Sequence, residues 1–161
     1  MVSLADIDLL PLQSSLKYSR DRKGQLLVLD PVRRKFIRAT PEEIVRQLWI
    51  LYFLNIPKVN IKLISVERAF NINGLLRRFD LVIFDRSTHP ILLAEFKAPD
   101  IKINQSTFDQ IAHYNMQLQV PYSLISNGDK HYCFQIDDAE KSFIWQKAFP
   151  ESLTLNHLKG T

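Results

Sequence analysis

The chain has 161 residues, of which 46% are hydrophobic and 24% are charged, and its formal net charge is +4. This length suits one domain with its own core, and this composition excludes a disordered or fibrous chain. No segment approaches the ~20 apolar residues of a membrane span, and the N-terminus has no basic signal region. One cysteine, Cys133, permits no internal disulfide and reads as a buried structural thiol. We therefore expect a cytoplasmic protein without a membrane partner.

The N-terminal region is expected to contain a basic hairpin. Residues 1–15 read as a loosely ordered lead-in, and residues 16–161 as a single domain. Residues 16–30 predict a β-hairpin around the turn RDRKG, and residues 17–38 hold eight basic side chains against two acidic ones. Such an excess suits nucleic acid, with Arg33, Arg34 and Lys35 as candidate contacts, but a solvated hairpin explains it equally well.

The first helix has a clear start signal in the segment TPEE. Thr40 can cap the helix, Pro41 suits its first position, and Glu43 stands three residues after the cap, as in a capping box. The helix is expected to continue through IVRQLWILYFL and to end before Pro57. Residues 61–70 then read as a strand, and residues 71–74 (NING) as a turn.

The second half of the chain alternates strands with a helix. Residues 77–84 (RRFDLVIF) and 91–97 (ILLAEFK) predict two strands joined by the loop DRSTHP, and residues 104–107 lead into a helix over 108–119. Residues 120–126 and 130–136 predict two more strands, with a weak last strand at 143–145. Because a strand–helix–strand unit favours a parallel pair, we predict an α/β fold with a mixed sheet flanked by helices.

The stretch ILLAEFKAPD places Glu95 and Lys97 two residues apart in an otherwise apolar strand, so both side chains share a face. If the loop DRSTHP is centred on the hairpin, a residue of the preceding strand shares this face. The predicted facing pairs are Phe84–Ile91, Val82–Leu93 and Asp80–Glu95. Asp80, Glu95 and Lys97 are thus expected to cluster on one side of the sheet.

These three residues suggest a metal site. Two facing carboxylates in a half-buried sheet repel and lose hydration, and a hard divalent cation such as Mg²⁺ or Mn²⁺ relieves both penalties. The ligands would be Asp80, Glu95 and the backbone carbonyl of Phe96, with Lys97 acting on an attacking water or on phosphate charge. This chemistry suits phosphodiester hydrolysis. The alternative is an ion network in which Lys97 pairs with a carboxylate and binds no metal.

The same residues resemble a known signature. Asp80 followed by Glu95-Phe96-Lys97 is similar to the PD-(D/E)xK nuclease motif, with Phe79 in place of the usual proline. The blocks TPEEIVRQ, RRFDLVIFD, AEFKAP and FDQIAHYN resemble, in this order, the N-terminal domain of the restriction subunit of type I restriction enzymes. The resemblance spans residues 16–145 and implies a restriction-endonuclease-like αβββαβ core, DNA as the partner, and catalytic roles for Asp80, Glu95 and Lys97.

The resemblance implies further candidates on both helices. Glu43 matches the helical acidic residue of that fold, unless it serves only in the capping box. Gln110 and Tyr114 match a Q-x-x-x-Y element and share a helix face, where they either position the lysine or a phosphate or are ordinary helix residues. Arg77 and Arg78 precede the strand of Asp80 and are candidate phosphate contacts, unless they are plain solvated cations. In the predicted register Arg78 faces Lys97.

The sequence also sets limits on function. It holds no G-x-x-x-x-G-K-[ST] phosphate loop and no room for a motor domain, and its four histidines lack metal-ligand spacing. The expectation is therefore a stand-alone Mg²⁺-dependent endonuclease domain acting on DNA, with a homo-oligomer or restriction-modification partners left open. The alternative is a catalytically inactive module of the same fold that binds nucleic acid or a partner.

Overall fold

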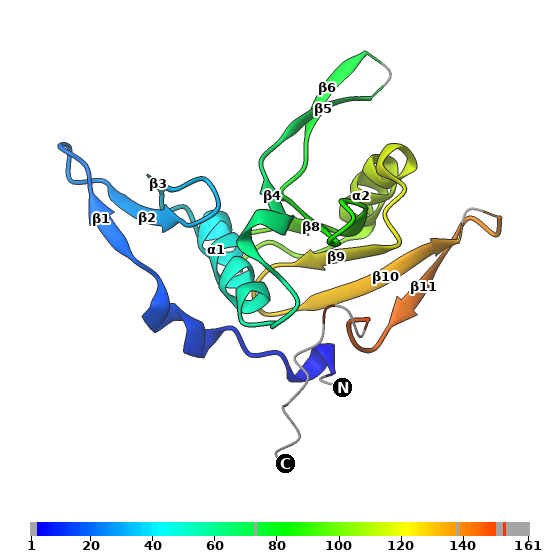
Figure 1. Cartoon of the computed structure of the whole chain (residues 1–161), viewed down its shortest axis with the longest axis horizontal. Coiled ribbons are helices and arrows are strands. Elements are labelled where there is room, and N and C mark those ends of the chain that lie inside the picture. The colour runs from blue at the N-terminus through cyan, green and yellow to red at the C-terminus, as the bar shows by residue number, and fades with distance from the viewer. Residues whose placement is uncertain (1–2, 73, 138, 151–152, 154–161) are drawn as a thin grey trace.

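A six-stranded mixed sheet forms the centre of the computed structural model, which describes residues 3–72, 74–137, 139–150 and 153 (Figure 1). The strand order is β11-β10-β9-β8-β7-β4. These strands are β4 (Ile64–Val66), β7 (Leu81–Phe84), β8 (Pro90–Phe96), β9 (Tyr122–Ser126), β10 (His131–Asp137) and β11 (Ser142–Gln146). The pair β8–β9 is parallel and its neighbours are antiparallel, which confirms the predicted mixed sheet and the parallel pair around a crossover helix.

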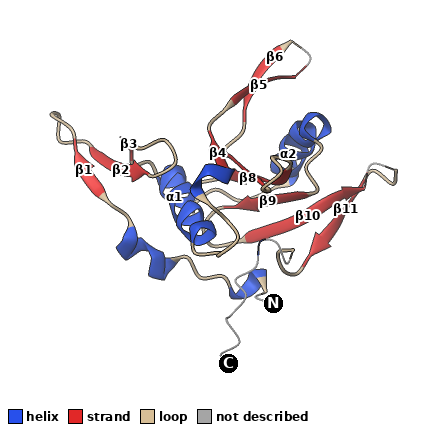
Figure 2. Ribbon diagram, viewed as in Figure 1, coloured by secondary structure: helices blue, strands red, loops and turns tan. Residues whose placement is uncertain are grey.

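The two long helices, α1 (Pro41–Leu54) and α2 (Gln105–Leu118), cover opposite faces of this sheet (Figure 2). Alternate strand residues show this: Leu81 and Ile83 pack in one core cluster with α1, whereas Val82 packs in the other with α2. The predicted start of α1 is confirmed, because the Thr40 hydroxyl accepts a hydrogen bond from the backbone N–H of Glu43 at 3.2 Å. No helix in the described part of the chain is long and apolar enough to cross a membrane.

The N-terminal segment packs onto the core on the α1 side. It forms two short 3-10 helices, η1 (Leu4–Asp6) and η2 (Leu10–Ser15). Leu4, Ile7 and Leu9 are buried in the cluster that also contains Trp49 of α1. These contacts tie down the segment that the sequence suggested would be loosely ordered.

The predicted N-terminal hairpin is present and belongs to a three-stranded sheet. The hairpin is β1 (Tyr18–Arg20) with β2 (Leu26–Asp30), and β3 (Lys35–Arg38) pairs with the far edge of β2. The strand β3 was not predicted. The turn before it is held by Asp30, whose Oδ1 accepts the backbone N–H groups of Val32 and Arg33 at 2.8 Å.

Two strand predictions are wrong because the chain breaks where a continuous strand was expected. Residues 61–70 divide at Glu67, which has a positive φ of 54°, into η3 (Ile61–Leu63), β4 and β5 (Ala69–Ile72). Residues 77–84 divide at Phe79 and Asp80 into β6 (Leu75–Arg78) and β7. β5 and β6 form a separate two-stranded ribbon that projects from the main sheet (Figure 1). Part of the predicted turn, residue 73, lies outside the described residues.

The register of β7 and β8 is partly as predicted. Val82 pairs with Leu93, which confirms the predicted register at that position. The predicted Phe84–Ile91 pair is wrong, because the register shifts between Ile83 and Phe84 and Phe84 pairs with Pro90. The irregularity lies at the loop end, so it does not disturb the end that carries Asp80.

Candidate active site

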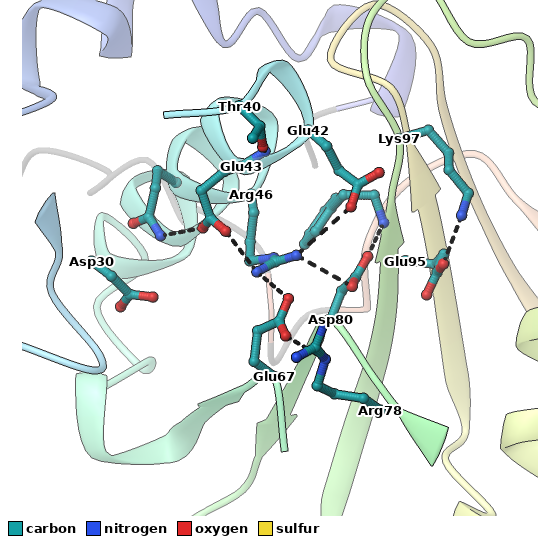
Figure 3. A network of polar contacts seen from close by, with 12 residues as sticks. Asp30, Thr40, Glu42, Glu43, Arg46, Glu67, Arg78, Asp80, Glu95 and Lys97 are labelled. Carbon is teal, nitrogen blue, oxygen red and sulfur yellow. Dashed lines mark hydrogen bonds and ion pairs between the residues drawn. The ribbon is translucent and has the colours of Figure 1, made fainter. Parts of the chain in front are cut away.

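Asp80 and Glu95 come together at one end of the adjoining strands β7 and β8. Asp80 immediately precedes β7, Glu95 is the penultimate residue of β8, and Lys97 directly follows that strand. One carboxylate oxygen of Asp80, Oδ2, accepts the backbone N–H of Phe96 at 2.7 Å. This bond holds the Asp80 side chain against the strand that bears Glu95, and Figure 3 shows the two carboxylates beside each other.

The pKa values of both carboxyl groups are raised, which favours their neutral forms. Burial, followed by the charge of Glu95, raises the pKa of Asp80 to about 7, although Arg46 and the Phe96 N–H oppose the shift. Burial also raises the pKa of Glu95, although its hydrogen bonds from Lys97 and Gln110 oppose the shift. The cations and hydrogen-bond donors of the protein therefore do not fully compensate the negative charges of Asp80 and Glu95 when both are ionised.

Lys97 is bound to Glu95 in this arrangement. Its Nζ donates to Glu95 Oε1 at 2.8 Å (Figure 3). Burial lowers the pKa of Lys97, but the hydrogen bond and charge of Glu95 and the charge of Asp80 outweigh burial and raise that pKa overall. The side chain is therefore an ammonium donor at neutral pH.

The helix α2 supplies Gln110 and Tyr114 to the same site. Gln110 Nε2 donates to Glu95 Oε1 at 2.6 Å and to the Tyr114 hydroxyl at 3.3 Å. The expected shared face of the two residues is thus present. Gln110 contacts Glu95 directly and Tyr114 accepts a hydrogen bond from Gln110, so the pair bears on the orientation of the carboxylate.

A buried arginine that the sequence reasoning missed lies between Glu43 and Asp80. The Arg46 residue is 2% exposed, and its guanidinium contacts Asp80 Oδ1 at 3.3 Å and Glu43 Oε2 at 2.9 Å. It also forms an ion pair with Glu67 and lies 4.0 Å from Glu42 (Figure 3). A cation inside the apolar helix segment IVRQLWIL was the available signal, whereas Glu67 gave none.

Glu43 is committed to this cluster of charges. Besides Arg46, its carboxylate accepts Gln47 Nε2 at 2.9 Å and Arg33 Nη2 at 3.5 Å. The backbone N–H of Thr40 donates to the Arg38 carbonyl instead, so only one half of the predicted capping box forms. Glu43 thus reaches Asp80 only through the guanidinium of Arg46.

Of the three basic residues predicted to contact nucleic acid in the N-terminal region, one forms an ion pair within the protein and two are exposed. Arg33 Nε pairs with Asp30 Oδ2 at 2.6 Å, so part of its charge is used within the protein. Arg34 and Lys35 are exposed in the turn and at the start of β3. Arg33 also contacts Glu43 in the first turn of α1, and the β1–β2–β3 region is separate from the ribbon that carries Arg77 and Arg78 (Figure 1).

The predicted position of Arg78 opposite Lys97 is wrong. Arg78 faces Ala69 in the β5–β6 ribbon, because the chain leaves the main sheet before Asp80. Its Nε forms an ion pair with Glu67 Oε2 (Figure 3). Arg77 faces Phe70 in the same ribbon and is exposed.

The donor set around Asp80 and Glu95 suits an oxygen-liganded ion only if solvent or substrate completes it. Among the described residues, no group of three or more His, Cys, Asp or Glu side chains could hold a metal ion. Cys133 is a buried thiol whose pKa is raised to about 12 by burial, so it is not a soft ligand here. Two carboxylates with the Phe96 carbonyl are, however, a donor set that Mg²⁺ accepts together with water and phosphate oxygens.

Comparison with known proteins identifies the family. No curated protein sequence shows a significant match to the chain. Residues 41–150, which include Arg46, Asp80, Glu95 and Lys97, match the family model described as "Type I restriction enzyme R protein N terminus". Because this match covers more than half of the chain, the protein belongs to the type I restriction enzyme R protein N-terminal family and is related to a restriction nuclease subunit.

Proposed function

We propose that this protein is a metal-dependent endonuclease that hydrolyses phosphodiester bonds in DNA. The observation that carries the proposal is the buried pair Asp80 and Glu95, whose pKa values are both raised above the ordinary carboxyl range. A fold gains nothing in stability from two under-compensated carboxylates, so their presence in a restriction-enzyme family fits a functional demand. Mg²⁺ or Mn²⁺ bound by Asp80, Glu95 and the Phe96 carbonyl would meet that demand.

The charge of the surrounding network supports one divalent ion. The groups joined by ion pairs around Arg46, together with Glu95 and Lys97, comprise six carboxylates and four cations among the described residues. The carboxylates are Asp30, Glu42, Glu43, Glu67, Asp80 and Glu95, and the cations are Arg33, Arg46, Arg78 and Lys97. When all are ionised, the excess is two negative charges, which one dication neutralises.

The hydrogen bonds of Glu95 leave room for a ligand bond. Lys97 and Gln110 both donate to Oε1, whereas Oε2 accepts no side-chain hydrogen bond from the residues that the structure describes. A bound Mg²⁺ would supply Lewis-acid activation of water and charge neutralisation at the phosphate. Gln110 would then hold the Glu95 carboxylate in its ligand orientation.

Lys97 is assigned to charge stabilisation and water orientation. Because its pKa is raised, the ammonium keeps its proton at neutral pH and cannot act as the initial base. An ammonium hydrogen-bonded to a carboxylate beside the reacting phosphate can donate to an attacking water or to a phosphate oxygen. Removal of one such donor lowers turnover by roughly 100-fold to 1,000-fold in comparable sites.

A second candidate is a DNA-binding module without catalysis. It is favoured by the contacts of Arg46 with Asp80 and of Lys97 with Glu95, which give each carboxylate a cation without any metal. In this case the site is an ion network that supports the fold, and the basic surfaces alone carry the function.

A cleavage assay separates these functions. Supercoiled and linear duplex DNA would be incubated with the protein in Mg²⁺, in Mn²⁺ and in EDTA, beside Lys97→Met, Glu95→Gln and the control Lys58→Met. Lys58 lies beside Phe84 and Ile91, at the opposite ends of β7 and β8 from the site. We expect metal-dependent nicking that both site variants lose by about 100-fold or more and the control retains. Binding without cleavage by the folded wild type would favour the inactive module, and cleavage retained by both site variants would refute the assigned site.

A further inference from the structure

The β5–β6 ribbon is an isolated two-stranded sheet. It projects beyond the six-stranded sheet in Figure 1, and in the described part of the chain its strands hydrogen-bond only to each other. A two-stranded ribbon is at best marginally stable alone in water. Such an element, held at its base and free along its length, is suited to contact a partner.

The ribbon carries charge of one sign. Residues 68–79 contain Arg68, Arg77 and Arg78 and no acidic residue. Arg68 and Arg77 are exposed and form no ion pair with any residue that the structure describes. This local field complements a polyanion rather than an apolar or basic partner surface.

An exposed apolar side chain, Leu76, stands on the same ribbon. Leu76 is 72% exposed and faces Asn71 across the ribbon. Residues two apart in a strand share a face, so Leu76 lies on the side of Arg78, and Arg77 lies on the other. The ribbon thus has arginines on both faces, and the exposed Leu76 shares a face with Arg78.

The base of the ribbon is joined directly to the candidate active site. Glu67 pairs with Arg78 of β6 and with Arg46, and Arg46 contacts Asp80 (Figure 3). In addition, the backbone N–H of Glu67 donates to the Asp80 carbonyl at 3.2 Å. The base of the ribbon is therefore held beside Asp80, one of the two carboxylates of the candidate site.

From these four observations, and on the basis of the proposed nuclease function, we infer that the β5–β6 ribbon is an arm that enters the major groove of duplex DNA. The major groove is wide enough for a two-stranded ribbon, and arginine side chains of such a ribbon can reach the phosphates that flank the groove. Arg68 and Arg77 contact the phosphates, and Leu76 contacts base or sugar surface in the groove. Arg78 remains with Glu67 and fixes the arm to the site.

Duplex binding without cleavage tests the arm. Fluorescence anisotropy in EDTA, at several salt concentrations, would compare the wild type with Arg68→Ala/Arg77→Ala, with Leu76→Ser and with the control Lys58→Ala/Arg86→Ala. The control removes the same charge from the opposite end of β7. We expect the arginine variant to bind about tenfold or more weakly and to reduce the logarithmic salt dependence by about 2, or about 1 for each phosphate contact. Leu76→Ser should weaken binding by roughly tenfold.

The duplex-binding experiment has two outcomes that would contradict the proposed arm. If both arm variants bind duplex within twofold of the control, the arm does not contact DNA and its partner belongs to another class. If only the arginine variant weakens binding, insertion into the groove is refuted. All variants must unfold at the wild-type temperature, which their exposed positions favour.

A small substrate separates the arm from the nuclease site. Bis(4-nitrophenyl) phosphate is too small to span the ribbon, so arm variants should hydrolyse it in Mn²⁺ at the wild-type rate while Lys97→Met does not. If the arm variants hydrolyse the small substrate normally and bind DNA as the wild type does, the proposed DNA contact of the arm is refuted and the proposed nuclease activity is retained. Weakened DNA binding with no hydrolysis by any protein would retain the arm and refute the proposed catalysis.

Discussion

Replacement of Asp80 by asparagine should leave the stability of the metal-free protein nearly unchanged in acid and should raise it in mild alkali. The reason is the pKa of Asp80, which burial and the charge of Glu95 raise from 3.8 to about 7. Between these values the folded protein binds a proton that the unfolded chain does not. The free energy of unfolding of the wild type therefore falls as pH rises through this interval.

The size of the effect follows from the same shift. Each unit of pKa difference is worth about 1.36 kcal/mol, so ionising Asp80 in the fold costs about 4 kcal/mol by pH 8. Asparagine does not titrate and keeps an oxygen for the Phe96 N–H, and the cost of ionisation given above already includes the favourable charge of Arg46. The variant should therefore match the wild type near pH 4 and be up to about 4 kcal/mol more stable than the wild type at pH 8.

Urea unfolding in EDTA at pH values from 4 to 8 measures this difference. The stability difference between Asp80→Asn and the wild type should rise by about 4 kcal/mol across the series. The control is Asp100→Asn at an exposed carboxyl that forms no ion pair with the residues that the structure describes, so it should not show the rise expected for Asp80→Asn. A difference for Asp80→Asn that stays constant, or that falls with pH, would refute the assigned burial and coupling of this group.

Three other changes test the same electrostatic picture. Mg²⁺ should raise the unfolding temperature of the wild type more at pH 8 than at pH 5, because its ligands must be ionised, and an equal rise in Glu95→Gln by scanning fluorimetry would contradict this. Arg46→Met leaves buried carboxylates without their cation and should lose about 3–5 kcal/mol at pH 8, whereas a urea-derived loss below about 1 kcal/mol would show that the network tolerates its removal. Gln110→Leu removes a donor that opposes the raised pKa of Glu95, so the pH midpoint of Mg²⁺ stabilisation should move upward, and an unchanged midpoint would argue against this contact.

Local signals were enough to predict most of the main sheet and both helices. The cap at Thr40 and Pro41 depends on neighbouring residues, and so does the start of α2, where Asn104 caps the helix. The parallel pair β8–β9 follows from the helix that separates the strands. These features do not require knowledge of distant contacts, which explains why the sequence alone suffices for them.

The breaks in the strands depend on distant contacts. Residues 61–70 and 77–84 look continuous in sequence, but Glu67 adopts a positive φ and pairs with Arg46 on another element. A single sequence offers no signal for that pairing. The predicted position of Arg78 was wrong because its strand leaves the main sheet and pairs with β5 in the ribbon.

The proximity of Asp80 and Glu95 was predicted from the sequence, whereas the contact of Arg46 with Asp80 was missed. Alternation along β8 and the hairpin before it were sufficient to bring Asp80 toward Glu95, although the contact that holds Asp80 is with the Phe96 N–H. Arg46 lies one helix away, and the sequence showed only a cation among apolar residues. Its four carboxylate neighbours come from three separate parts of the chain.

The position of Arg46 bears on how an ion would enter the site. The guanidinium lies on the Oδ1 side of Asp80 and separates that residue from Glu43 (Figure 3). A dication next to it would meet a fixed positive charge, so the favourable approach is from the Glu95 side, where Oε2 is unoccupied by described donors. A second dication would reverse the charge of a network whose excess is two negative charges. We therefore infer that Glu43 acts through Arg46 as a counter-charge, and that the site is arranged for one ion rather than two.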